Sequence, residues 1–102
     1  MATKQEIDKT IIKKFNEHKI DLREKFHVES LSIFGSFSKG TAGLDSDLDV
    51  LVQYKKTPGF FAFLDLKQYL ETITGRQVDL VTEGALKKQL RETILQEAIR
   101  VT

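Results

Sequence analysis

The sequence contains no cysteine, a single proline and no apolar run long enough to cross a bilayer. Without cysteine, neither a disulfide framework nor a thiolate zinc site can form. Lys and Arg total 16 against 15 for Asp and Glu, and this balance does not favour direct nucleic-acid binding. The first ten residues lack the apolar segment of a signal peptide. We therefore expect a cytoplasmic protein that contacts no membrane.

Enough apolar material is present for a real core, since 40% of the 102 residues are hydrophobic. We expect a single domain over residues 1–102, which is a common domain size. Apolar residues at helical spacing predict three helices, over residues 7–26, 60–73 and 86–99. Runs rich in β-branched and aliphatic residues predict three strands, over residues 28–34, 47–54 and 77–81.

This order of elements predicts an α/β (α+β) fold in which helices flank a small three-stranded sheet. The order alone does not settle the strand directions. Phe60, Phe61 and Phe63 lie together at the start of the second helix. We expect this aromatic cluster to belong to the core, with a partner interface as the second interpretation.

The segment "DSDLDVLV" places carboxylates directly before a strand that looks buried. Asp47 and Asp49 are two residues apart, so on an extended chain they share a face, roughly 6.5–7 Å apart. Two carboxylates that close repel each other, and burial disfavours their charged forms. A hard divalent cation removes both penalties, which makes Mg²⁺ the natural candidate. The alternative is a solvated strand edge.

Asp79 repeats this pattern between Val78 and Leu80 in a third apolar strand. If the two strands are neighbours, Asp79 completes a cluster of three carboxylates with Asp47 and Asp49. Such a cluster suits two metal ions that clamp the attacking and leaving oxygens of a phosphoryl transfer. The alternative is that Asp79 merely ends its strand or pairs with Arg76.

The turn "GSFSKG" between the first two strands has the chemistry of a phosphate site. Gly35 allows a ligand to approach the backbone closely, and Ser36 can cap a short helix whose N–H groups face an anion. Lys39 adds a positive charge in the same loop. The segment does not match a P-loop, because Thr41 stands where lysine is required. An EF-hand is also excluded, because Val50 stands where that loop requires glycine.

The combination of "GSFSKG", "DSDLDVLV" and a later carboxylate in "QVDLV" resembles the minimal nucleotidyltransferases (MNT type) of the DNA polymerase beta-like superfamily. The resemblance extends over essentially the whole chain in length and element order. It implies a small mixed sheet flanked by helices, and a reaction that moves a nucleoside monophosphate from a triphosphate to a hydroxyl group.

The resemblance also implies roles for individual residues. Asp47 and Asp49 would bind the metal ions, expected to be two Mg²⁺. Asp79 would be the third carboxylate, which also acts as a base. Gly35 and Ser36 would hold the triphosphate. Lys39 stands where family members often have arginine, and lysine lacks the planar, bidentate contact of a guanidinium group.

Stand-alone proteins of this type resemble the antitoxin of HEPN/MNT toxin–antitoxin pairs. This resemblance implies transfer of AMP from ATP to a tyrosine of a HEPN toxin partner. Two alternatives stay open on the sequence. The chain could be a binding module that neutralises its partner by occlusion, or a subunit that modifies a small molecule.

Overall fold

The computed structural model describes residues 4–35 and 47–102. It begins with two helices, α1 (Lys4–Glu17) and α2 (Lys19–Lys25), where the sequence predicted one helix over residues 7–26. At the break, Nδ1 of His18 lies 2.9 Å from the hydroxyl of Tyr69. Tyr69 belongs to the next helix along the chain, α4 (Phe60–Thr74). The break is therefore tied to a tertiary contact, which helical spacing alone could not reveal.

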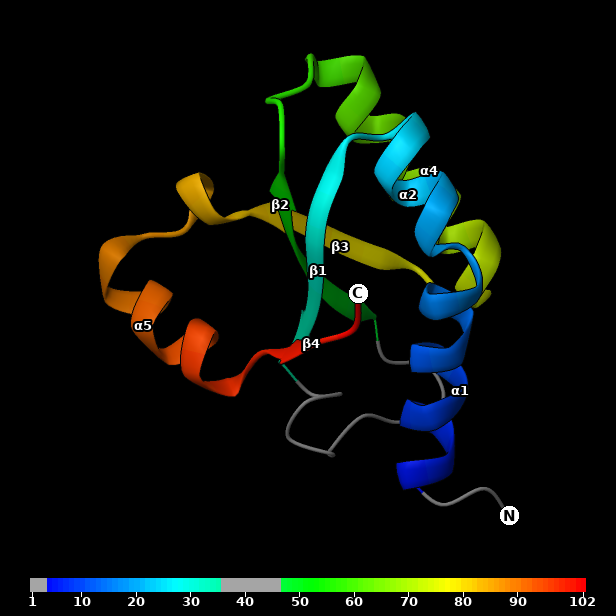
Figure 1. Cartoon of the computed structure of the whole chain (residues 1–102). Helices are drawn as coiled ribbons and strands as arrows, with labels where there is room; N and C mark the ends of the chain where they lie inside the picture. The colour runs from blue at the N-terminus through cyan, green and yellow to red at the C-terminus, as the bar shows by residue number, and fades with distance from the viewer. Residues whose placement is uncertain (1–3, 36–46) are drawn as a thin grey trace.

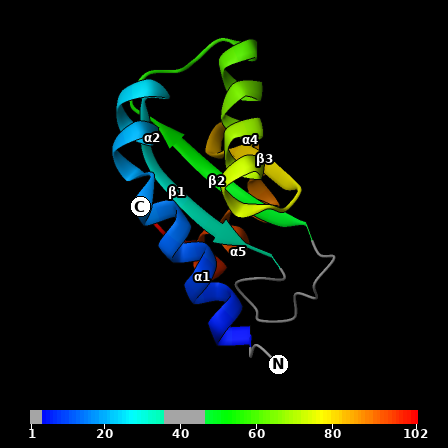
Figure 2. The ribbon, with the colours of Figure 1, turned by 90° about the vertical axis from the view of Figure 1, so that its right-hand side faces the viewer.

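Three strands form close to the predicted ranges: β1 (Val28–Phe34), β2 (Leu48–Tyr54) and β3 (Val78–Thr82). β1 and β2 are antiparallel, whereas β2 and β3 are parallel, so the sheet is mixed. Parallel neighbours need a crossover, and α4 supplies it by carrying the chain from the end of β2 back to the start of β3. β2 consequently lies between β1 and β3 (Figure 2).

A fourth strand that the sequence analysis did not predict completes the sheet. The last helix, α5 (Lys88–Glu97), ends earlier than predicted, and β4 (Ile99–Arg100) pairs antiparallel with β1. The N–H of Val101 donates to the carbonyl of Leu31 at 2.9 Å, which anchors the following residues to the same edge. A two-residue strand has no periodicity that a sequence can display. The predicted α/β class is confirmed, with the strand order β3-β2-β1-β4.

The core lies on one face of the sheet, under α1, α2 and α4. Alternate residues of the strands point to this face. Figures 1 and 2 show the three helices together on this side and α5 on the other. The buried apolar side chains of this core cluster are Ile11, Phe15, Leu22, Val28, Leu31, Ile33, Leu48, Val50, Val52, Leu66, Leu70, Val78, Leu80 and Val101. Leu51 is also buried but does not belong to this cluster.

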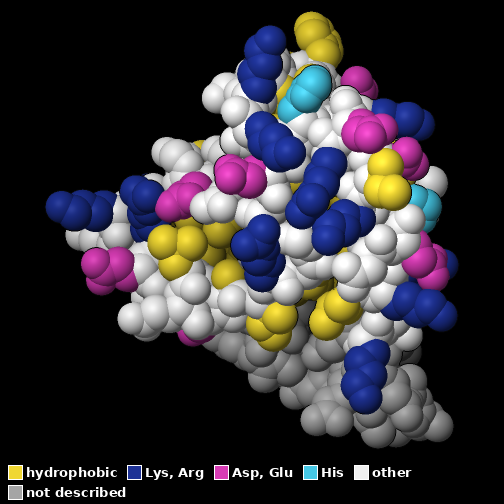
Figure 3. Space-filling view, viewed as in Figure 1, with side chains coloured by type: hydrophobic (Ala, Val, Ile, Leu, Met, Phe, Trp, Pro, Cys, Tyr) yellow, Lys and Arg dark blue, Asp and Glu magenta, His cyan; other side chains and the backbone are white. Residues whose placement is uncertain are grey.

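α5 does not pack as its apolar spacing predicted. None of its residues is buried, and Leu90 and Leu95 are exposed, as is Ile99 after it. Hydrophobic side chains are visible beside this helix in Figure 3, where basic and acidic groups are otherwise interspersed. Arg91 of α5 makes a 2.6 Å ion pair with Glu83 of the 3-10 turn η1 (Glu83–Ala85). α5 therefore contacts the neighbouring turn η1 through an ion pair and buries no apolar side chain.

α4 ends within one residue of the predicted boundary, and it is followed by Gly75 in the left-handed conformation, whose N–H donates to the carbonyl of Glu71 at 2.9 Å. Its start corrects a prediction. Phe60 and Phe61 are exposed, and only Phe63 of the aromatic cluster packs against the core. No helix within residues 4–35 and 47–102 has the length and apolar character of a membrane span.

Candidate functional site

Three neighbouring strand ends carry predicted site residues. β1 ends just before Gly35, whereas Asp49 and Asp79 are each the second residue of a strand. β1 is antiparallel to β2 and pairs Phe34 with Asp49, and β3 is parallel to β2 and pairs Asp79 with Asp49. The topology therefore places Gly35, Asp49 and Asp79 at the same end of the sheet.

Asp49 and Asp79 face the same side of the sheet, away from the helices that cover the core. Paired positions on adjacent strands are about 4.8 Å apart and project to the same face. Asp49 is half-buried, whereas Asp79 and Asp47, which directly precedes β2, are exposed. These three carboxylates are thus open to solvent from one side.

The three carboxylates interact electrostatically. Burial raises the pKa of Asp49, and the negative charges of Asp79 and Asp47 raise this pKa further. Negative charge is therefore in excess here. Oxygen donors in such excess fit a hard dication such as Mg²⁺. The negative charges that disfavour the ionised form of Asp49 attract this cation. In the described part of the chain, no three His, Asp or Glu side chains already stand in the geometry of a metal site.

Gly35 is required at its position for two independent reasons. Its φ is +73°, in the left-handed region that L-residues rarely adopt. In addition, a Cβ at this residue would overlap Oδ2 of Asp49. The carboxylate of Asp49 therefore lies directly against the backbone at the start of the predicted phosphate turn. Ser36 and Lys39, predicted for the same turn, lie outside the described residues.

Substituting Asp49 by asparagine is expected to stabilise the protein without metal. A carboxyl whose pKa is raised on folding makes folding less favourable as pH rises above its ordinary value of 3.8. Asp49→Asn removes this loss, so its free energy of unfolding at neutral pH should exceed that of the wild type by about 1 kcal/mol or less, given the partial exposure.

The measurement is chemical denaturation of both proteins from pH 3 to pH 7 with EDTA present, so that the lower limit lies below the ordinary pKa of 3.8. The two curves should converge at the acidic end and separate towards neutrality. Asp65→Asn, at an exposed position of α4, is the matched control and should run parallel to the wild type. A stability advantage that persists unchanged at pH 3 would rule out this electrostatic cause.

Glu71 holds the start of β3 in register. Its Oε2 accepts the N–H of Val78 at 3.0 Å, and the carbonyl of Gln77 accepts the N–H of Leu48 at 2.9 Å. Val78 directly precedes Asp79 in the chain. Glu71 therefore links the end of α4 to the strand that presents Asp79, a tertiary role that the sequence analysis did not find and for which no local signal exists.

Removing this acceptor should displace Asp79 as well as destabilise the fold. We expect Glu71→Ala to cost about 1–3 kcal/mol, because a backbone N–H loses its partner. Glu71→Gln retains an amide oxygen at the same place and should recover most of the stability. Denaturation midpoints measure the loss of stability, and Mg²⁺ affinity measures the displacement of Asp79. Equal Mg²⁺ affinity in Glu71→Ala and wild type would contradict the positioning role.

A polar network continues along the face that carries Asp49. Ser30 Oγ donates to Gln53 Oε1 at 2.8 Å, and Gln53 Nε2 donates to Glu83. The pKa of Glu83 is lowered, first by its hydrogen bond to Arg91 and then by that to Gln53. This network joins β1, β2, η1 and α5, and so sets where α5 stands relative to the open face.

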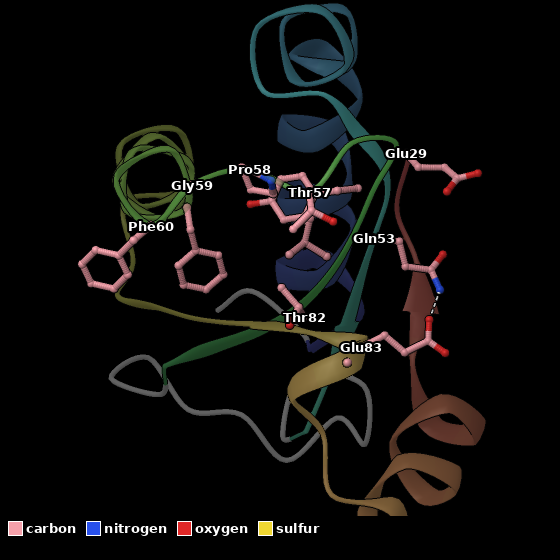
Figure 4. Close-up of a pocket in the computed structure, with 12 residues that line it drawn as sticks. Glu29, Gln53, Thr57, Pro58, Gly59, Phe60, Thr82 and Glu83 are labelled. Atoms are coloured by element: carbon pink, nitrogen blue, oxygen red, sulfur yellow. Dashed lines mark hydrogen bonds between the residues drawn. The ribbon is translucent and has the colours of Figure 1, made fainter.

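A cavity of about 670 Å³ lies at the other end of β2. Gln53, four residues or about 13 Å beyond Asp49, lines it. Figure 4 shows Glu29, Gln53 and Glu83 on one side of the strands and Pro58, Gly59 and Phe60 on the other. Burial raises the pKa of Tyr54, another lining residue, to about 12, so its hydroxyl stays protonated. The cavity is separate from the carboxylates, and the sequence analysis did not predict it.

The fold and the carboxylates at one end of the sheet are compatible with a nucleotidyl-transfer enzyme, and comparison with known proteins gives this class. A family profile described as a nucleotidyltransferase domain matches residues 12–101. The chain belongs to this nucleotidyltransferase family. Among its relatives, the protein adenylyltransferase MntA of Thermococcus cleftensis is 39% identical over 101 residues, which cover 99% of this chain and 98% of the relative.

Solved structures show the same similarity. A structure described as a minimal nucleotidyltransferase has a TM-score of 0.70 and 37% identity, covering 81% of this chain and 85% of its own. A toxin–antitoxin structure with AMP-PNP has a TM-score of 0.69 and 25% identity, covering 84% of this chain and 71% of its own. The resemblance inferred from the motifs is thereby confirmed.

Proposed function

We propose that residues 1–102 form one catalytic domain that transfers AMP from ATP to a hydroxyl group of a partner protein, with Mg²⁺ as cofactor. The acceptor we propose is a tyrosine of a HEPN-type toxin, which the modification silences, so that the chain acts as an antitoxin. The observation that carries this proposal is the juxtaposition of Gly35, Asp49 and Asp79 on three adjacent strands. The other functions left open by the sequence are outcomes of the test below.

Asp47 and Asp49 would hold Mg²⁺ at the start of β2, and Asp79 would add a third carboxylate from the start of β3. Bound there, Mg²⁺ would neutralise the triphosphate and lower the pKa of the acceptor hydroxyl. Gly35 has no side chain, which allows the carboxylate of Asp49 to lie directly against the backbone at the start of the turn that we propose holds the phosphates. Ser36 and Lys39 are proposed to contact the same phosphates.

The acceptor oxygen attacks the α-phosphorus of ATP. A new P–O bond forms to the acceptor, the bond between the α-phosphorus and its bridging oxygen breaks, and pyrophosphate leaves. Asp79 is exposed at the open side of the site, so it can receive the hydroxyl proton from an acceptor that arrives from solvent. Positioning and charge neutralisation supply most of the rate enhancement in this class of reaction.

The choice of ATP and of a protein acceptor is supported by the relatives. One relative that matches nearly the full length is named a protein adenylyltransferase, and a structural neighbour is a toxin–antitoxin complex with AMP-PNP. The open side next to Asp49 and Asp79 is compatible with an acceptor that is itself a folded protein.

The test is to incubate the chain with a HEPN-type protein, taken from the neighbouring gene where one is encoded there, with or without Mg²⁺ and ATP labelled at the α-phosphate. We expect label and the mass of AMP on the partner, mapped to a tyrosine by fragmentation, and loss of its RNase activity only when ATP is present.

Each other outcome selects a different function. Silencing of the RNase to the same degree without ATP would replace the proposal with neutralisation by occlusion. Label that appears on a metabolite and never on a protein would identify a subunit that modifies a small molecule. Label transfer that survives complete removal of Mg²⁺ with EDTA would refute the cofactor.

A further inference from the structure

One arginine stands on the strand at the edge of the sheet that is opposite to β3. Arg100 belongs to β4, and both residues of β4 are exposed. It is the only Lys or Arg within the four strands that the structure describes, whereas β2 and β3 carry Asp49 and Asp79. Figure 1 shows β4 beside the end of β1, the end that leads to Gly35. A positive group therefore lies near the same end of the sheet as the carboxylates.

Arg100 projects to the same face of the sheet as Asp49. β4 pairs Arg100 with Ser32 of β1, and β1 pairs Ser32 with Leu51 of β2. Paired residues of neighbouring strands share a face, and Leu51 shares a face with Asp49, two residues before it. Leu51 is buried outside the core cluster, which agrees with this assignment. The guanidinium group and the carboxylates therefore stand on one face, on opposite sides of β1.

The separation between Arg100 and Asp49 leaves room for a phosphate group. β4 and β2 are two strand spacings apart, about 9.6 Å, and the two residues are offset by about 6.8 Å along the strands. Their Cα atoms are therefore about 12 Å apart. An extended arginine side chain covers roughly 7 Å of this distance, since its bonds are about 1.5 Å long. The guanidinium group thus stops short of the carboxylates, and a metal-bound anion fits between them.

The guanidinium group of Arg100 has donors for such an anion. Its Nε donates to the carbonyl of Thr102 at 2.7 Å, which holds the side chain at the edge of the sheet. Arginine has five N–H donors, and the two terminal nitrogens carry the other four. No carboxylate of the described residues forms an ion pair with Arg100. A planar group of this kind binds phosphate through two parallel hydrogen bonds.

We propose that Arg100 binds the β- and γ-phosphates of ATP and holds the pyrophosphate as it leaves. This inference rests on the proposed function, because it takes ATP as the substrate of this site. In-line displacement places the attacking oxygen and the leaving oxygen on opposite sides of the α-phosphorus. The acceptor approaches Asp79 on β3, so the pyrophosphate leaves on the side of β1 and β4. Gly35 and Arg100 lie on that side.

Calorimetric titration of the intact chain with pyrophosphate or with ATP, in the presence of Mg²⁺ and without an acceptor, tests the inference. We expect Arg100→Gln to weaken the affinity for both ligands at least about tenfold, because charge-assisted hydrogen bonds to phosphate are lost. Arg100→Lys keeps the charge without the planar group, and its affinity should lie between those of Arg100→Gln and the wild type. Arg23→Gln, at an exposed position of α2, is the matched control and should bind like the wild type.

Protection of the wild-type chain from chemical modification gives a second measurement, which does not depend on the folding of a variant. Phenylglyoxal modifies exposed arginine side chains, and mass spectrometry of the peptides gives a rate for each of them. Pyrophosphate with Mg²⁺ should slow the modification of Arg100 at least several-fold and leave that of Arg23 unchanged. An unchanged rate at Arg100 under saturating pyrophosphate would overturn the inference.

The outcomes separate this inference from the proposed function. Equal affinity of the wild type and Arg100→Gln for both ligands would overturn the inference alone. A wild-type chain that binds neither ATP nor pyrophosphate would overturn both. Binding that depends on Arg100, without AMP transfer to a partner, would support the inference and refute the proposed acceptor.

Discussion

Asp49→Asn and Asp47→Asn are each expected to lower the rate of AMP transfer by at least about a hundredfold. Loss of an outer hydrogen bond to a metal ligand already costs roughly 10–100-fold in affinity or activity, and a ligand itself contributes more. An asparagine side chain is neutral, so each substitution removes one negative charge from the proposed metal site. Asp47→Asn removes a charge that raises the pKa of Asp49, and Asp49→Asn removes the charge of Asp49 itself. Initial rates with labelled ATP and saturating Mg²⁺ measure the effect.

Asp65→Asn serves again as the control, since it removes an exposed carboxylate from α4 without touching the end of the sheet. Its rate should equal that of the wild type. For Asp49→Asn, the loss of activity should accompany the gain in metal-free stability described above. A slow enzyme that is also unstable would point to misfolding. Transfer at the wild-type rate by either substitution at Asp47 or Asp49 would refute the site.

Among the Gly→Ala substitutions in the described part of the chain, Gly35→Ala is expected to reduce stability and transfer activity most. An L-residue at φ +73° costs about 1–2 kcal/mol. The new Cβ also collides with Oδ2 of Asp49, so that carboxylate or the turn must move. We therefore expect reduced stability together with transfer activity at least about tenfold lower, because displaced catalytic groups lose rate steeply.

Gly75→Ala separates these two effects. Gly75 has nearly the same φ, +68°, but a Cβ there meets no atom within 4 Å. Gly75→Ala should lower the free energy of unfolding, because alanine disfavours a positive φ, and should keep wild-type transfer activity. If Gly35→Ala and Gly75→Ala lose stability equally and neither loses activity, the contact between Gly35 and Asp49 has no role in the reaction.

Local patterns were sufficient for much of this fold. Runs of β-branched and aliphatic residues predicted β1, β2 and β3, and helical spacing predicted α4 over residues 60–73, because these features depend on neighbours in the chain. The break at His18 and the pairing of β4 with β1 depend on contacts with distant residues. Neither could be derived from spacing.

The exposed surfaces show the same limit more sharply. Helical spacing correctly predicted a helix over much of residues 86–99, and an aromatic cluster at residues 60–63 was correctly recognised as apolar. The spacing of apolar residues predicts that a helix has an apolar face. It does not predict whether other elements of the same chain pack against that face. α5 has no buried residue, and Phe60 and Phe61 point to solvent, because no other element of the described chain reaches them.

The sequence by itself determined the chemistry of the site. Glycine and serine in a turn, two aspartates at the start of a strand and a third in a later strand predict oxygen donors for a cation and a contact surface for phosphate, and these predictions do not depend on the fold. Only the tertiary structure decided that Asp79 stands beside Asp49 and that Gly35 leaves no room for a side chain. Residues 30 positions apart become neighbours through the parallel pairing of β2 with β3, a long-range contact whose register no local pattern encodes.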